Sequence, residues 1–412
     1  MRKLLTGNGA AAWGMRLAKA DYLPAFPITP QTEIIETISQ WIEEGEIEAT
    51  MVTMDSEHSM ITAAGTAAAT GVRVFTATSS QGLLYAMEMI YTVPGWRAPF
   101  VLVNVSRALS SPVTLEPDHN DILAARDSGF LQIHCSTCQE VVDAMLLAYR
   151  LAEDDRIRLP VIVNLDGYYL SFTREPVTLP EQEKTDQFLK RTGPEVKGFC
   201  ASNPCSQGVA VLGGSQYSFF RYETHLASCN GIKVFSEIAA EFESLFGRRY
   251  QAVESYRAYD ADIVFFMIGS FATKAKDAVN QLRSRGIKAG LVRPLLLRPF
   301  PEEAIIKALQ NKKGVAVIDQ NISLGKGGIL YSELASILYN VKKRPEVLVS
   351  FIGGLGGRDL TPEDFFEMAK VTTEAADSGV TPPPRLLYTR EELAAMHGLQ
   401  EIALYSDTQT RE

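Results

Sequence analysis

The sequence has little that belongs to a membrane or exported protein. Across its 412 residues no apolar run approaches the roughly 20 residues that span a bilayer. The basic start "MRKLL" has only a short apolar stretch before Asn8 and Gly9, too short for the core of a signal peptide. With 46% hydrophobic and 22% charged residues, the composition is that of a water-soluble globular protein. We therefore expect a cytoplasmic protein with no membrane partner.

Positive charge is also scarce. The chain has 40 Lys and Arg against 49 Asp and Glu, which gives a formal net charge of −9. Its densest basic pieces are "GRRY" and "NKKG". Proteins that bind nucleic acids present a basic face to the phosphate backbone, so this composition argues against that class.

Cysteines are few. There are five, an odd number that does not suit a disulfide framework. Cys135 and Cys138 form a C-x-x-C in "HCSTCQE", but Cys200, Cys205 and Cys229 form no second one, so a four-thiolate zinc site is incomplete. No ferredoxin-type cluster motif exists. We expect the pair to be small packing residues, with a redox pair or half of a zinc site as the alternative, and we predict no metal site in this chain.

What the chain does have is an alternation of short apolar runs and helical patterns. The runs "VRVFTAT" (72–78), "PFVLVNV" (99–105) and "LPVIVNL" (159–165) suit strands that are buried on both faces. Helical spacing follows in "QGLLYAMEMIYTV" and "TCQEVVDAMLLAYRLAEDD". This alternation predicts an α/β fold with a parallel sheet between helices.

A second unit of the same kind begins near residue 255. It contains the expected strands "ADIVFFMIGS" and "KGVAVIDQ" and an expected helix that ends at Gly286. The stretch 183–254 carries turn signals before a helix at "IKVFSEIAAEFESLFGRRY", and we interpret it as a connector. The organisation we predict is therefore a first domain (1–182), this connector, a second domain (255–375) and an extended Pro-rich tail (376–412).

A glycine motif lies near the N-terminus. "TGNGAAAWG" places Gly7, Gly9 and Gly14 in a G-x-G-x4-G spacing, which differs from the G-x-G-x-x-G of dinucleotide-binding folds. We interpret it as a turn that opens a helix, whose free N–H groups could still hold an anion.

Two prolines bracket a short polar stretch in "FPITPQTEI". Pro27 and Pro30 restrict the backbone around Ile28 and Thr29. Thr29 is expected to be a helix N-cap with Pro30 at the first helical position. Capping does not explain the stiffening on both sides, which is a feature of a binding site.

A third stretch, "DSEHSMITAAGTAAATG", places Asp55, Glu57 and His58 before a run of small residues. The dipole of a helix N-terminus would account for one acid there. It does not account for Glu57 beside an Ala-lined surface, where a carboxylate needs a partner.

These stretches together carry a family resemblance. "FPITPQTEI", "DSEHS", "TSSQGLLYAMEMI", "SRAL", "PDHNDILAARDSGFLQ" and "LPVIVNLDGYYLS", in this order, resemble the alpha subunit of the thiamine-diphosphate-dependent 2-oxoacid:acceptor oxidoreductases, the pyruvate:ferredoxin oxidoreductase superfamily. The resemblance covers nearly the whole chain. It implies a parallel-sheet thiamine-binding (pyrimidine-type) domain followed by an α/β domain that is similar to the C-terminal domain of transketolase.

The resemblance also implies roles for three of the stretches. Glu57 is expected to be catalytic, with its carboxylate on the aminopyrimidine ring of thiamine diphosphate, and Ile28 and Thr29 are expected to bind the same cofactor. Thr29 and Arg107 match positions that hold the carboxylate and carbonyl of the 2-oxoacid. An Arg is suited to a bidentate contact with a carboxylate.

The second half of such a site is missing from the sequence. Thiamine enzymes hold the diphosphate through Mg²⁺ on a G-D-G…N-N element, and "LDGYY" has no such partner downstream. The resemblance therefore implies a beta subunit that brings the diphosphate and Mg²⁺, gamma and ferredoxin-like subunits that carry Fe–S clusters, and CoA as co-substrate.

Departures from the family pattern bear on the substrate. Phe26 stands where the family often has Tyr, Thr29 argues against oxalate, and the loop "ALSSPVTLEPDHND" resembles the phenylglyoxylate dehydrogenase branch. That branch implies phenylglyoxylate as substrate, benzoyl-CoA as product and a NAD-reducing flavoprotein as a further partner. The alternative is pyruvate or another 2-oxoacid. From different classes, a NAD-binding dehydrogenase and a non-catalytic scaffold also remain open.

Overall fold

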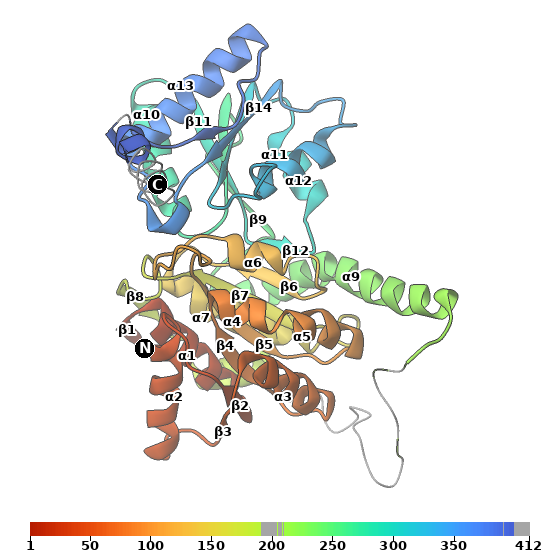
Figure 1. Ribbon diagram of the computed structural model, residues 1–412. Coiled ribbons are helices and arrows are strands. Elements are labelled where there is room, and N and C mark those ends of the chain that lie inside the picture. Colours follow the sequence, from red (N-terminus) through yellow and green to blue (C-terminus); the bar gives the residue numbers. More distant parts are fainter. Residues whose placement is uncertain (191–203, 205–207, 209, 390, 399–412) are drawn as a thin grey trace, which may run out of the picture.

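The fold consists of two α/β units, one above the other in Figure 1. The computed structural model describes residues 1–190, 204, 208, 210–389 and 391–398. Within these ranges, no helix is both long enough and apolar enough to cross a bilayer. The predicted α/β fold with parallel sheets is confirmed, because each unit is built around a mostly parallel sheet.

The first unit has a five-stranded sheet in the order β12-β6-β7-β5-β4. Four of these strands are parallel: β4 (Phe75–Thr78), β5 (Val101–Ser106), β6 (Leu131–His134) and β7 (Val161–Asp166). β4, β5 and β7 match the apolar runs predicted as strands, whereas β6 was not predicted. The parallel pair β2 (Tyr22–Ala25) and β3 (Thr50–Thr53) continues this layer, since a parallel bridge joins Tyr22 to Val74 just before β4.

Helices cover both faces of this layer. One face packs against α1 (Gly7–Ala18), α2 (Thr32–Glu43) and α7 (Cys138–Ala152), and the other against α3 (Glu57–Ala69), α4 (Ser80–Tyr85) and α5 (Met87–Thr92). The short elements around them are β1 (Arg2–Leu5), β8 (Glu175–Thr178), α6 (Asn120–Ala124), α8 (Gln182–Phe188) and the 3-10 turn Val93–Trp96. β1 and β8 form a separate antiparallel two-stranded sheet.

The second unit has a six-stranded sheet in the order β15-β14-β13-β10-β11-β9. Its strands are β9 (Val253–Tyr256), β10 (Ile263–Phe266), β11 (Ala289–Pro294), β13 (Gly314–Asp319), β14 (Val347–Ile352) and β15 (Arg385–Leu386), and only β9 is antiparallel. On one face lie α10 (Ala272–Ser284) and α13 (Pro362–Ser378); on the other lie α11 (Glu302–Leu309) and α12 (Ile329–Leu338). A short 3-10 turn spans Leu355–Gly357.

The two units share strands, core and buried charges. β12 (Leu296–Arg298) leaves the second unit and pairs antiparallel with β6 of the first sheet. Arg293 at the junction is 1% exposed and bonds to Glu140 of α7 and Glu254 of β9. One apolar cluster runs from the first unit into the second. The two units therefore form one packed body.

The stretch expected to be a connector contains a long helix. α9 (Gly214–Phe246) begins well before the expected start, and its C-terminal half buries Val234, Phe235 and Phe242 in the core of the first unit. In Figure 1 its N-terminal half extends beyond the body of the molecule. Part of this stretch, and positions 399–412 of the expected extended tail, lie outside the described residues. We keep the division at 1–182, 183–254, 255–375 and 376–412 as a proposal.

Candidate functional site

The candidate site forms where four parallel strands end. β2, β3, β4 and β5 point the same way, so the loops that follow them meet at one edge of the layer. The chain passes from β2 outward to β3 and then crosses to β4 on the other side of β2, which creates a topological switch point, the usual place for a ligand in an α/β sheet. Glu57, Arg107, the loop 26–31 and the segment 79–82 at the start of α4 lie at this edge.

Glu57 is the first residue of α3 and its side chain is buried, with 5% exposure. Ser56 caps the helix through its hydroxyl and the Ser59 N–H. Burial raises the pKa of the Glu57 carboxyl above its ordinary value, against a smaller lowering by its own backbone N–H. Among the described residues no side chain donates a hydrogen bond to this carboxylate.

Gly82 leaves the room that the carboxylate occupies. A Cβ at Gly82 would lie 2.4 Å from Glu57 Oε1 and 2.6 Å from Thr78 Oγ1. The hydroxyls of Thr78 and its neighbour Ser79 are fully buried and have no hydrogen-bond partner. Unsatisfied buried polar groups are rare in native proteins, so two hydroxyls without partners beside a carboxylate that has no side-chain donor indicate a place for a hydrogen-bonding ligand.

The loop between β2 and α2 differs from its expected form. The prediction of Thr29 as N-cap was wrong: α2 begins at Thr32, and Gln31 takes the N-cap position without a side-chain bond. The local sequence rule failed because the loop is instead fixed through its carbonyl oxygens. Asn8 of α1 donates to Pro30 O at 2.9 Å, and the Gln31 side chain donates to Phe26 O at 3.0 Å.

Arg107 directly follows β5, as its place after an apolar run predicted, and connects two of the loops. Its Nη1 donates to Thr29 O at 2.7 Å and its Nη2 donates to Gln81 Oε1 at 3.1 Å. Burial lowers the pKa of this half-buried guanidinium, and the Asp121 carboxylate opposes that shift. Its Nε–H is buried without a partner. The Thr29 side chain is exposed, and Ile28 beside it is half-buried. Arg107 and the Thr29 backbone thus meet at the more exposed part of the candidate site, whereas the Glu57 side chain is buried and packs against Gly82.

Comparison with known proteins gives this arrangement a context. Residues 13–227 match the family described as "Pyruvate flavodoxin/ferredoxin oxidoreductase, thiamine diP-bdg", and residues 261–365 match "Pyruvate:ferredoxin oxidoreductase core domain II". The chain is 39% identical to the pyruvate synthase subunit PorA of Pyrococcus abyssi over 394 residues, which cover 95% of this chain and 99% of that one. The chain belongs to the alpha subunits of the 2-oxoacid:ferredoxin oxidoreductases.

Other relatives of this alpha subunit have different substrates in their names. The ketoisovalerate oxidoreductase subunit VorA of Pyrococcus horikoshii is 39% identical over 380 residues, which cover 92% of this chain and 95% of that one. Relatives of both names are alpha subunits of enzymes that act with partner subunits. This chain is accordingly an enzyme subunit that works with partners.

Solved structures share the fold. A 2-oxoglutarate:ferredoxin oxidoreductase from Magnetococcus marinus aligns over 91% of this chain with a TM-score of 0.67 at 19% identity, and this chain spans 65% of the length of that one. A split-gene transketolase aligns over 88% of this chain and 97% of that one with a TM-score of 0.51 at 13% identity. The alpha subunit therefore has a thiamine-binding-type domain and a transketolase-like domain, as the resemblance implied.

The glycines of the N-terminal motif lie at close packing contacts, and both cysteines of the C-x-x-C are buried. A Cβ at Gly7 would lie 2.4 Å from Leu170 O and one at Gly14 would lie 2.4 Å from Met145 Cβ, so these glycines allow α1 to pack closely, and Thr6 caps the helix. Cys135 and Cys138 are buried free thiols, and burial raises the pKa of Cys138 to about 12 and that of Cys135 well above its ordinary value. Protonated buried thiols are unreactive. Within the described ranges, no group of three His, Cys, Asp or Glu side chains could hold a metal ion.

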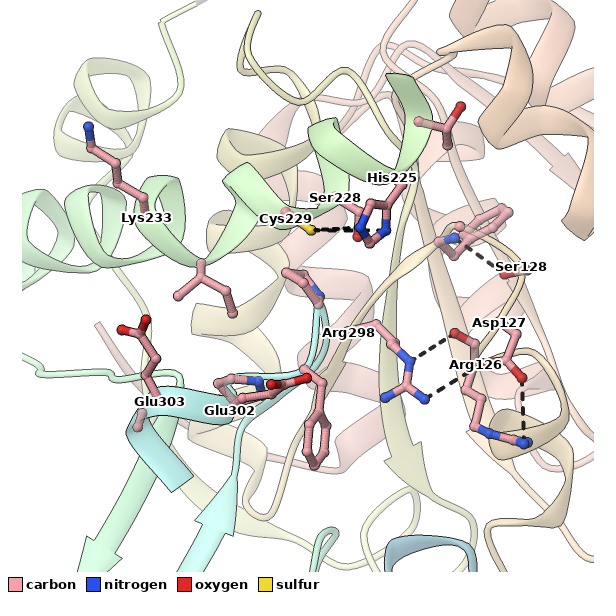
Figure 2. A pocket seen from close by; sticks show the side chains of 18 of the residues that line it. Arg126, Asp127, Ser128, His225, Ser228, Cys229, Lys233, Arg298, Glu302 and Glu303 are labelled. Atoms are coloured by element: carbon pink, nitrogen blue, oxygen red, sulfur yellow. Dashed lines mark hydrogen bonds and ion pairs between the residues drawn. The ribbon is translucent and has the colours of Figure 1, made fainter. Parts of the chain in front are cut away.

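A separate cavity lies between α9, the loop 126–130 and residues 298–304. It has a volume of about 850 Å³, and none of the predicted site residues lines it. Figure 2 shows the Cys229 sulfur beside the His225 ring on α9, at 3.5 Å from His225 Nε2. Arg298 at this cavity donates to Glu333 and to the Arg126 carbonyl. The cavity is also lined by charged side chains such as Lys233, Glu302 and Glu303, and it is separate from the site at Glu57.

Sequence reasoning gave no role to Thr78, Gln81, Gly82 or Asp121. The motifs "TSSQG" and "PDHND" were used only as evidence for the family resemblance. The signal that could have identified the first three is a run of small polar residues directly after a buried strand, at the edge of the sheet where ligands bind. Asp121 had no comparable signal, because its partners lie on other loops.

Proposed function

We propose that this alpha subunit carries the aminopyrimidine half of a divided thiamine diphosphate site in an enzyme that oxidatively decarboxylates a small 2-oxoacid to its acyl-CoA. In the overall reaction a carbon–carbon bond breaks, CO2 leaves, the acyl group passes to the CoA sulfur, and two electrons pass singly to Fe–S centres. The observation that carries the proposal is the buried Glu57 carboxylate without a side-chain partner, in the space left by Gly82.

Glu57 is suited to hold a proton for the cofactor. When bound, thiamine diphosphate supplies the electron sink that decarboxylation of a 2-oxoacid needs. Burial raises the pKa of Glu57, so its carboxyl exchanges a proton with a ring nitrogen more readily than an exposed glutamate would. Thr78 and Ser79 offer two further hydrogen-bonding groups for the ring. Ile28 and Thr29 would line the same cofactor from the facing loop.

Arg107 and Thr29 are proposed to hold the substrate. The guanidinium has five N–H donors, and its hydrogen bonds to Thr29 O and Gln81 Oε1 use one on each Nη. The remaining donors can take the carboxylate of a 2-oxoacid, and the exposed Thr29 hydroxyl can donate to its carbonyl oxygen. Arg107 is half-buried, which excludes water from that ion pair and strengthens it.

The half-site requires partner chains. We propose a beta subunit that brings the diphosphate and Mg²⁺ half, with gamma and ferredoxin-like subunits that carry the Fe–S clusters, and CoA as co-substrate. A NAD-reducing flavoprotein would be a further partner only if the electrons leave through NAD. The acidic net charge of the chain is consistent with protein partners and not with nucleic acid.

For the substrate we propose pyruvate or a short branched 2-oxoacid, because relatives at similar identity are named for pyruvate and for ketoisovalerate. The resemblance of the loop "ALSSPVTLEPDHND" makes phenylglyoxylate the alternative. Ferredoxin-linked activity of the purified complex with pyruvate, 2-oxoisovalerate and phenylglyoxylate, each with CoA, distinguishes the three. A kcat/KM highest for phenylglyoxylate would refute the aliphatic proposal.

The test of the half-site is Glu57→Gln in the assembled complex. We expect kcat to fall by roughly 10²- to 10⁴-fold, as for the loss of a general acid–base group. The matched control is Glu88→Gln on α5, which removes a carboxylate whose side chain is 80% exposed. Equal co-purification of partners with wild type and both variants shows that assembly is intact. Normal turnover of Glu57→Gln would contradict the role of Glu57 and with it the proposed half-site.

A further inference from the structure

We propose that Asp121 is the positioning residue of this site: its buried carboxylate fixes the turn at Ser80 and the backbone of Arg107, and so holds Gln81 and Arg107 together for the 2-oxoacid. The inference rests on the proposed function, because it assigns Arg107 to the substrate. It adds a residue that contacts neither substrate nor cofactor and acts through two that do.

The Asp121 carboxylate accepts hydrogen bonds from three segments: the start of α4, the end of β5 and α6 itself. Asp121 lies in α6 and is fully buried. Its Oδ2 accepts from Ser80 N at 3.1 Å, Arg107 N at 3.3 Å and Asn104 Nδ2 at 3.1 Å. Its Oδ1 accepts from Ser106 Oγ at 3.0 Å and from Ile122 N at 2.7 Å. One carboxylate thus joins the loops after β4 and β5, which carry the substrate-side groups.

The contact to Ser80 has a specific consequence for the backbone. Ser80 has a φ of +50°, in the left-handed region that a residue with a Cβ rarely adopts. Such a conformation persists only when the surroundings enforce it. Asp121 accepts the Ser80 N–H, and the Ser80 hydroxyl lies 3.0 Å from Ala108 O and 2.6 Å from Gln81 Oε1. This turn directs Gln81 toward Arg107.

The same turn bears on the cofactor side. Gly82, two residues after Ser80, leaves the space for the Glu57 carboxylate. A shift of the turn would therefore move Gln81 away from Arg107 and Gly82 toward Glu57. Asp121 is placed to set both distances.

The ionised form of Asp121 suits these contacts. Four of them come from N–H donors, which a carboxylate accepts, whereas a protonated carboxyl would have one acceptor site fewer. Burial raises the pKa of Asp121 to about 6, with the Asn104 amide opposing and Asp118 adding to the rise, so the group is ionised at neutral pH. The Asp121 carboxylate acts to raise the pKa of Arg107, and it adds to the rise in the pKa of His119.

A merely structural role would give a different kinetic result from a positioning role. If Asp121 only stabilises the fold, its removal lowers the melting temperature and the amount of active enzyme but leaves KM unchanged. If it positions Arg107, the molecules that fold bind the 2-oxoacid poorly. The KM for the 2-oxoacid is therefore the deciding quantity.

The experiment compares Asp121→Asn with Asp143→Asn in the assembled complex. Asp143 is an equally buried carboxylate on α7, held by Arg248 and Tyr250 away from the site. We expect both variants to melt at lower temperature, and only Asp121→Asn to raise the KM for the 2-oxoacid, with kcat/KM reduced on the order of a hundredfold. An unchanged KM in Asp121→Asn, or an equal rise in Asp143→Asn, would overturn the proposal.

A second comparison separates this proposal from the proposed function. Arg107→Met tests the substrate role of Arg107 itself: an unchanged KM there refutes the proposed function. If Arg107→Met raises KM and Asp121→Asn does not, the proposed function stands and the positioning role fails. If Asp121 acts through Arg107, the double variant is little worse than Arg107→Met alone.

A third variant covers the case that Asp121→Asn does not assemble. Glycine adopts a φ of +50° without strain, so Ser80→Gly combined with Asp121→Asn should restore assembly if the task of Asp121 is to hold that turn. The restored complex is then expected to show the raised KM, since the contact to Arg107 N is still lost. Failure of the double variant to assemble would refute the role assigned to the turn.

Discussion

Replacement of Gly82 by Ala tests the space around the Glu57 carboxylate. Gly82 lies within α4 and its φ is not in the left-handed region, so the backbone would accept Ala. On helix propensity alone the change should stabilise the protein by about 0.5–1 kcal/mol. The added Cβ, however, would lie 2.4 Å from Glu57 Oε1, 2.9 Å from Glu57 Cδ and 2.6 Å from Thr78 Oγ1. These contacts are all too short.

Overpacking of this kind typically costs about 1–3 kcal/mol. We expect a net loss in the free energy of unfolding of about 1 kcal/mol, because part of the strain is relieved when the flexible end of Glu57 moves aside. That movement takes the carboxylate from its position, so the larger effect should fall on the cofactor. A loss of about 1.4 kcal/mol of contact weakens binding tenfold, and we expect at least this change in the Kd for thiamine diphosphate.

Two measurements on the assembled complex check this prediction: thermal unfolding, and titration with thiamine diphosphate by calorimetry after its removal. The control is Gly214→Ala at the start of α9, where a Cβ would meet nothing within 4 Å. The control should be neutral or slightly stabilising, with an unchanged Kd. If Gly82→Ala behaved in the same way as Gly214→Ala, the close packing of Gly82 on Glu57 would be wrong.

Three further predictions concern buried groups outside the site. Burial opposes charge on His119, but the Asp166 carboxylate 2.8 Å away outweighs burial, so the pKa of His119 is raised. Burial alone would raise the pKa of Asp166, but His119 and Ser270 outweigh burial, so that pKa is lowered. The stabilisation of the folded state by His119 is thus fully present below its unfolded pKa of about 6.5 and is lost as the pH rises through its higher folded pKa. The stabilisation by Asp166 is lost as the pH falls through its depressed folded pKa. Asp166→Asn should therefore lower the free energy of unfolding by about 3–5 kcal/mol, and urea titrations should show a larger loss at about pH 5.5 than at about pH 9. Arg293→Met removes the cation that pairs with Glu140 and one of the two cations that pair with Glu254, which keeps Lys276. It should lower the free energy of unfolding by about 3–5 kcal/mol in the same assay, and a loss below about 1 kcal/mol would contradict the importance of the buried pair. Cys135→Ala should lower the melting temperature slightly and leave turnover and assembly intact, whereas loss of electron transfer to ferredoxin would revive the redox interpretation.

Structural features that depend on neighbouring residues or on a periodic apolar pattern could be predicted from the sequence. The strands β4, β5, β7, β10 and β13 were all expected from apolar β-branched runs, because strands buried on both faces require them. The place of Arg107 at a strand end followed from the same reading. The identity of the half-site came from the ordered motifs, and the roles of Glu57, Thr29 and Arg107 stay predictions.

What the sequence could not show depends on pairs that are distant along the chain. The N-cap at Thr29 was a reasonable prediction from the local sequence. Asn8 and Arg107 instead fix that loop by donating to its carbonyl groups. Since every residue has a backbone carbonyl, such bonds cannot be predicted from residue type. The need for glycine at position 82 cannot be predicted from the local sequence, because it arises from Glu57 of α3 packing against it. Asp121 was invisible for the same reason, since its partners come from loops after two other strands.

The return of β12 to the first sheet has a consequence for how the chain can be divided. With β12 removed, β6 would become an open sheet edge with unpaired backbone groups, a surface that pairs readily with other chains. A fragment that ends at residue 254 should therefore self-associate although its sequence includes the whole predicted first domain and α9. In the intact protein, the first sheet cannot melt without releasing the segment between β11 and α11. The two units are accordingly expected to unfold in one cooperative transition, and motions during turnover must take place within this body or between it and its partner subunits.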